Sequence, residues 1–103
     1  PIAYHKTHLS ESEQDVLDLA EDAERGGSLK FWQDYVGSVE KRLDQRFAGR
    51  DNFHDISDTY EESTDSLFMD LCHTNQQGYK MVAERMLPYI MKAIDNQLRS
   101  TTP

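Results

Sequence analysis

The sequence of 103 residues has little that would cross-link a small protein, since Cys72 is its single cysteine. One cysteine excludes an internal disulfide and any zinc site built from cysteines alone. No segment approaches the roughly 18 uninterrupted apolar residues that a membrane helix needs, and no basic-then-apolar signal peptide opens the chain. We therefore expect no membrane span, and a modest core held by packing and hydrogen bonds.

Positive charge is also scarce, with 11 Lys and Arg residues against 19 Asp and Glu residues and a net charge of -8. This balance argues against binding a phosphate backbone, so we expect no nucleic-acid partner. The length allows at most one domain. The chain starts at Pro1 and its first methionine is Met69, so we expect further residues upstream.

The first of three predicted helices runs from about Glu11 to Arg25. Ser10 and Glu13 form the S-x-x-E pattern of a capping box, in which two side chains bind free amides at a helix start. Gly26-Gly27 should end the helix. Its few apolar positions lie among acids, which indicates a surface helix with one buried edge.

The second predicted helix starts after Ser28, a suitable N-cap, and stops at Gly49. Its apolar residues recur at three- and four-residue steps, the pattern of an amphipathic helix. They are Leu29, Trp32, Val36, Val39, Leu43 and Phe47.

The third predicted helix begins near Asn75 and carries one long apolar face. Pro88 removes a hydrogen bond inside this helix, so we expect a kink or break near residues 84–87 and fraying from Arg99 to Pro103. The face consists of Tyr79, Val82, Ala83, Met86, Leu87, Ile90, Ile94 and Leu98.

Two short segments are predicted strands: Pro1 to Tyr4, as the tail of a strand, and Asn52 to Ile56, which alternates apolar and polar residues. Asp58 to Asp65 is acidic and should be an exposed loop. Two strands do not make a self-sufficient sheet. We therefore expect the isolated chain to expose apolar helix faces and to self-associate or pack loosely.

Asp70 and His73 are the candidate catalytic residues. At this i, i+3 spacing the carboxylate can accept the Nδ1 proton of the imidazole, which leaves Nε2 free as a base. An acid and a base so paired are two of the three groups that activate a serine for attack on an ester carbonyl. The spacing is common, however, and Asp70 can instead cap a turn beside a solvated or core histidine.

The surrounding residues give this pair a more specific context, formed by Leu67, Phe68, Asp70, His73, Asn75, Gly78, Tyr79, Ala83 and Glu84. This pattern resembles the C-terminal block of the SGNH, or GDSL-type, hydrolases. The resemblance implies an α/β fold with three α/β/α layers and a mostly parallel sheet, of which residues 1–103 would be a single partial domain with three helices and one or two strands. It also implies ester hydrolysis, with His73 as the base and Asp70 as the acid that orients it.

The chain departs from that family in lacking the Gly-Asp-Ser motif of the nucleophile and the Gly and Asn of the oxyanion hole. Its Gly-Ser neighbours, Gly27-Ser28 and Gly37-Ser38, do not follow an apolar strand. The chain alone should therefore be inactive. The expected partners are the missing N-terminal part of the same hydrolase or a second copy, with a small ester as substrate. The alternative is a non-catalytic helical interaction module.

Other constellations of reactive side chains are less favoured. Cys72 adjoins His73, but neighbouring side chains diverge, and a buried small hydrophobe is the preferred interpretation of this cysteine. His54, Asp70 and His73 are suitable metal ligands without a dense ligand spacing. The acids between Asp51 and Asp65 lack the glycine and ligand order of a calcium loop. We expect no cofactor and no metal.

Overall fold

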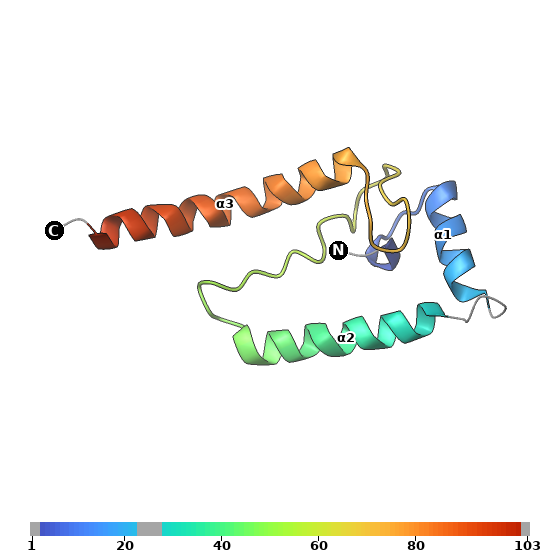
Figure 1. The fold of residues 1–103 in the computed structure, drawn as a ribbon, viewed down its shortest axis with the longest axis horizontal. Coiled ribbons are helices and arrows are strands. Elements are labelled where there is room, and N and C mark those ends of the chain that lie inside the picture. Colours follow the sequence, from blue (N-terminus) through green and yellow to red (C-terminus); the bar gives the residue numbers. More distant parts are fainter. Residues whose placement is uncertain (1–2, 23–27, 102–103) are drawn as a thin grey trace.

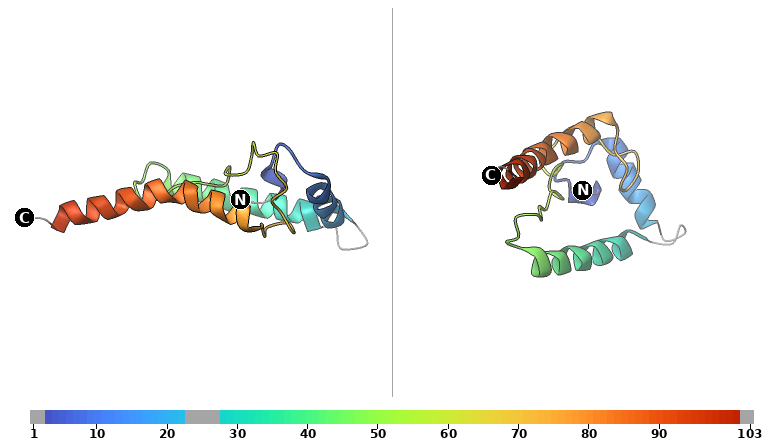
Figure 2. Two further views of the ribbon diagram at one scale, coloured as in Figure 1. Left: turned by 90° about the horizontal axis from the view of Figure 1, so that it is seen from above. Right: turned by 60° about the vertical axis from the view of Figure 1, so that its left-hand side comes forward.

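The computed structural model describes residues 3–22 and 28–101. Within them lie a short 3-10 helix η1 (Ala3–His5) and the helices α1 (Glu11–Glu21), α2 (Ser28–Phe47) and α3 (Gln76–Thr101). Figure 1 shows α2 and α3 extending in the same direction, with the irregular segment that joins them passing back between them. The views in Figure 2 show that these elements form one flat layer.

The predicted α/β fold with three α/β/α layers is wrong for the residues that the structure describes, because none of them forms a strand. One isolated antiparallel bridge pairs Phe68 with Thr74. Residues 52–56 are irregular, Ala3 and Tyr4 lie in η1, and Pro1 and Ile2 fall outside the described residues. A strand needs a neighbouring strand to pair its backbone groups, and the described chain provides none beside either segment.

The predicted capping box at the start of α1 is confirmed. The amide of Glu13 donates to the Ser10 hydroxyl, and the Glu13 carboxylate accepts from the amide of Ser10. The helix ends at Glu21, four residues before the expected Arg25. The expected Gly26-Gly27 stop lies outside the described residues.

Helix α2 has the predicted extent, and Gly49 adopts a φ of 82° just beyond its end. This left-handed conformation favours glycine and explains why the helix stops there. We expected the Ser28 side chain to cap the start of this helix, and that side chain lies outside the described part of the structure.

Helix α3 begins after Asn75, whose side-chain oxygen accepts from the amide of Gly78 at 3.1 Å. The helix continues through Pro88 to Thr101, so it has no break near residues 84–87, and residues 99–101 are helical. Proline removes one hydrogen bond, whereas the turns on both sides retain theirs. No helix in the described ranges has both the length and the apolarity to cross a membrane.

The buried core occupies one end of the molecule, where η1, α1 and the start of α2 meet residues 60–68. It consists of Ala3, Leu17, Leu29, Tyr60, Leu67 and Phe68. Away from this core the structure is open, with extents of 63 × 29 × 18 Å and a radius of gyration of 17.0 Å. A compact chain of this length would have a radius of gyration of about 13 Å.

The predicted exposure of apolar helix faces is confirmed. On α2 the exposed large hydrophobic residues are Phe31, Trp32, Tyr35, Val39 and Leu43. On α3 they are Tyr79, Met86, Leu87, Ile90, Met91, Ile94 and Leu98. Because neither face is covered within the described chain, both are available to a partner.

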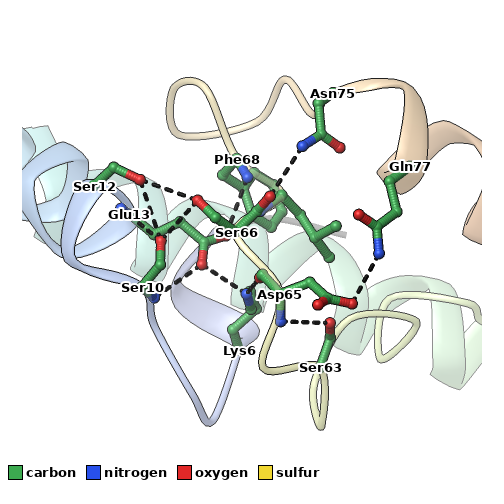
Figure 3. A network of polar contacts seen from close by, with 11 residues as sticks. Lys6, Ser10, Ser12, Glu13, Ser63, Asp65, Ser66, Phe68, Asn75 and Gln77 are labelled. Carbon is green, nitrogen blue, oxygen red and sulfur yellow. Dashed lines mark hydrogen bonds and ion pairs between the residues drawn. The ribbon is translucent and has the colours of Figure 1, made fainter.

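A buried ion pair between Lys6 and Glu13 holds the core end together (Figure 3). Lys6 Nζ lies 2.6 Å from Glu13 Oε1, and neither side chain is exposed. The other oxygen, Oε2, accepts from the amides of Leu67 at 3.1 Å and Phe68 at 3.0 Å. Lys6 also donates to the carbonyl of Asp65. One glutamate thus joins α1, the N-terminal segment and the segment that leads to Asp70.

Burial alone would raise the pKa of Glu13, but hydrogen bonds from Lys6 and from the amides of Ser10, Phe68 and Leu67 lower it from 4.5 to about 2. The folded protein therefore keeps this carboxylate ionised under conditions in which the unfolded chain binds a proton. The stabilisation is complete above about pH 4.5 and is lost as the pH falls toward 2.

We expect the free energy of unfolding to fall by about 3 kcal/mol from this group between pH 4.5 and pH 2. The measurement is urea unfolding followed by circular dichroism across that range. Glu13→Gln should be less stable at neutral pH and should lose this part of the pH dependence. Glu11→Gln removes an exposed carboxylate of the same helix turn, and this variant should keep the pH dependence of the unmodified chain. Equal pH dependence in Glu13→Gln and the unmodified chain would contradict the prediction.

Candidate functional site

The candidate site is a turn at residues 69–73, directly before α3. The Phe68–Thr74 bridge closes this turn, with the Met69 amide donating to the His73 carbonyl at 2.9 Å. Within it, Asp70 Oδ1 accepts from the amides of Cys72 at 3.0 Å and His73 at 2.7 Å. An aspartate that binds amides two and three residues later stabilises a turn, which explains the local fold.

The predicted contact between Asp70 and His73 is present. His73 Nδ1 lies 2.8 Å from Asp70 Oδ2 and 3.0 Å from Oδ1. A carboxylate only accepts, so Nδ1 is the donor and Nε2 of the neutral ring carries the free lone pair. The side chains are 58% exposed for Asp70 and 65% exposed for His73, so the pair stands open to solvent.

The hydrogen bonds from the Cys72 and His73 amides, followed by the His73 side chain, hold the pKa of Asp70 below its usual value. This carboxyl therefore stays ionised near neutral pH and can stabilise a positive imidazolium. Cys72 behaves in the opposite way, because the partial desolvation of its thiol, followed by the nearby Asp70 charge, raises the pKa of this otherwise exposed side chain. The thiol stays protonated, which makes it a poor nucleophile.

Two expectations about Cys72 are wrong. The residue is exposed rather than buried, and its Sγ lies 3.5 Å from His73 Nδ1 although neighbouring side chains were expected to diverge. Adjacent side chains diverge in regular helices and strands. This tight turn has neither geometry, and it brings the thiol, the imidazole and the carboxylate of Asp70 together.

Residues beyond the turn fix its position against α3. Asn75 Nδ2 donates to the Ser66 carbonyl at 2.9 Å, and Tyr60 Oη donates to the Gly78 carbonyl at 2.6 Å. A Cβ on Gly78 would lie 2.5 Å from the Thr74 side chain, so only glycine fits there without a shift. The sequence pattern included Asn75 and Gly78, but it gave no sign of the supporting Tyr60 and Thr74.

His54, the third residue of the metal set considered above, is separate from the Asp70 group. Its ring stacks on Tyr89 of α3 at 3.8 Å between ring centroids. It lines a pocket of about 440 Å³ together with Ile56, Met86 and Ile90. The set of His54, Asp70 and His73 is therefore not brought together.

No serine hydroxyl of the described residues forms a hydrogen bond with His73. Ser10, Ser12 and Ser66 bind one another at 2.9 to 3.2 Å beside Glu13 (Figure 3). Ser38 lies on the surface of α2, as expected. The arrangement thus supplies an oriented imidazole and its carboxylate, with no serine of the described residues beside them.

Comparisons with protein-family models, with curated proteins and with solved structures find no match to this chain. Any functional assignment therefore depends on the residues themselves.

We expect the neutral imidazole of His73 to carry its proton on Nδ1, because Asp70 accepts it there. Asp70→Asn weakens that acceptor and should raise the share of the tautomer protonated on Nε2. The ¹⁵N chemical shifts of the ring nitrogens, measured where the ring is neutral, report this ratio. His54 serves as an internal control whose shifts should not change. An unaltered His73 ratio in Asp70→Asn would contradict the assigned hydrogen bond.

Gly78→Ala should destabilise the protein by roughly 1–3 kcal/mol, because the new methyl group overlaps the Thr74 side chain. Gly37→Ala is the matched control: a Cβ at this position of α2 meets nothing within 4 Å. That substitution should stabilise the helix by roughly 0.5–1 kcal/mol. Urea unfolding of the two variants measures both effects, and the same sign for both would overturn the packing argument.

Proposed function

We propose that this chain supplies the acid and the base of a serine-type ester hydrolase, with Asp70 orienting His73 and the nucleophilic serine outside the chain. The observation that carries the proposal is the 2.8 Å contact of His73 Nδ1 with Asp70 Oδ2. Two backbone amides hold the other carboxylate oxygen, so the acid is fixed before any substrate arrives. The likeness of residues 67–84 to the C-terminal block of SGNH hydrolases supports the same assignment.

In this mechanism His73 Nε2 takes the proton of the serine hydroxyl as the oxygen attacks the ester carbonyl. The imidazolium then gives that proton to the leaving alcohol. Asp70 stays ionised throughout and stabilises the imidazolium, which agrees with the lowered pKa of its carboxyl. Donors for the oxyanion come from the same polypeptide that carries the serine. The substrate is a small ester.

The serine-bearing partner is the missing N-terminal part of the same hydrolase. A second copy of this chain lacks the Gly-Asp-Ser motif as well, so it is a partner for the exposed helix faces and not a source of the serine. The apolar faces of α2 and α3 support such a partner, because a row of exposed large hydrophobic residues is typical of an interface. Three neighbouring aromatic rings, Phe31, Trp32 and Tyr35, belong to this face in the first turns of α2.

The second candidate function is a non-catalytic helical module that binds a partner through the same faces. The lack of a serine beside His73 in the described chain favours it. The residues encoded upstream of Pro1 discriminate between the two functions. A Gly-Asp-Ser block there supports the hydrolase, and its absence supports the module.

The hydrolase proposal predicts that His73→Ala lowers the turnover of a p-nitrophenyl ester by about 10²–10⁴-fold in the assembly of this chain with the serine-bearing part. Asp70→Asn should lower kcat as well, because the base loses its orienting acceptor. His8→Ala is the control, since that exposed imidazole lies 3.9 Å from Glu62 and is not part of the pair. Equal turnover for His73→Ala and the unmodified assembly would rule out His73 as the base.

A further inference from the structure

The turn that holds the acid and the base also presents a third reactive group that ester hydrolysis does not use. Asp70, Cys72 and His73 each offer one ligand atom, and these atoms all lie within 4.8 Å of one another. All three residues are exposed, so an ion in solution reaches them without a change of fold.

The distance between the sulfur and the nitrogen of this group matches that of a tetrahedral zinc site. With Zn–S of about 2.3 Å and Zn–N of about 2.0–2.1 Å, tetrahedral angles place sulfur and nitrogen roughly 3.5 Å apart. Cys72 Sγ lies 3.5 Å from His73 Nδ1. The oxygen and nitrogen of such a site are roughly 3.4 Å apart. Asp70 Oδ2 is 2.8 Å from Nδ1, so a small side-chain rotation accommodates the ion.

We propose that Asp70 Oδ2, Cys72 Sγ and His73 Nδ1 bind a Zn²⁺ ion, with water in the fourth position. A mixed set of oxygen, sulfur and nitrogen ligands suits zinc, whereas magnesium and calcium prefer oxygen ligands alone. On binding, the thiol proton passes to solvent and the imidazole carries its proton on Nε2. Asp70 Oδ1 keeps its bonds to the Cys72 and His73 amides, which hold the carboxylate in place.

Zinc binding also has a consequence that rests on the proposed function. The zinc-bound ring is protonated on Nε2, the atom that would accept the serine proton, and its Nδ1 no longer donates to Asp70. The ion therefore inhibits the base. Binding itself does not depend on hydrolysis, so it is tested without an ester substrate.

The experiment titrates the full chain with Co²⁺, which takes the place of zinc and gives a charge-transfer absorption band when it binds a thiolate. We expect the band to saturate at one ion per chain and to disappear when Zn²⁺ is added. Cys72→Ser should abolish the band. His73→Ala should weaken the affinity by at least about tenfold. His54→Ala removes an imidazole outside the group and should leave the titration unchanged.

Absence of the band in the unmodified chain would overturn the proposal, as would an equal affinity for His73→Ala or a loss of binding in His54→Ala. Circular dichroism of each variant establishes that it has kept its helices. If cobalt does not bind but ester turnover still depends on His73, the zinc site is refuted and the hydrolase proposal stands. A normal titration with an inactive base refutes the hydrolase alone.

Discussion

Lys6 and Glu13 form an ion pair closed to solvent, and both residues also bind backbone groups more than fifty residues away. The glutamate uses both oxygens: one for Lys6 and the Ser10 amide, the other for two amides more than fifty residues later. Removing one partner of such a pair leaves an uncompensated buried charge, which typically costs about 3–5 kcal/mol. The rest of the core consists of few apolar side chains, so this network determines which segments meet.

The same network positions the candidate site. Glu13 binds the amides of Leu67 and Phe68. It thereby holds in place the residues at which the Phe68–Thr74 bridge begins. The bridge closes the turn that holds Asp70 against His73, and Asn75 then begins α3. A buried charge at one end of α1 is thus connected, through the Phe68–Thr74 bridge and the Asp70 carboxylate, to the orientation of an exposed imidazole.

The sequence allowed the helices, the capping box and the Asp70–His73 contact to be predicted, because each depends on residues a few positions apart. The second role of Glu13 was not predictable, since its partners lie far away in the chain. The alternation at residues 52–56 predicted a strand, yet here Phe53 stacks on Phe47 of α2 while His54 stacks on Tyr89 of α3. Successive side chains of an extended segment point in opposite directions, so here they contact the helices on either side. In a sheet they would lie on its two faces and give the same alternation in the sequence.

His73 has two proposed roles, as a base and as a metal ligand, and its exposure to solvent affects each of them differently. Water competes for the hydrogen bond between an exposed imidazole and a carboxylate, so its net stabilisation is small, and it strengthens when a partner excludes water. A metal ion that keeps a water ligand instead needs an open turn. A partner that covers this turn therefore favours the base, and an uncovered turn favours the metal. Because both roles require Nδ1 of the same ring, the cover over this turn decides between them.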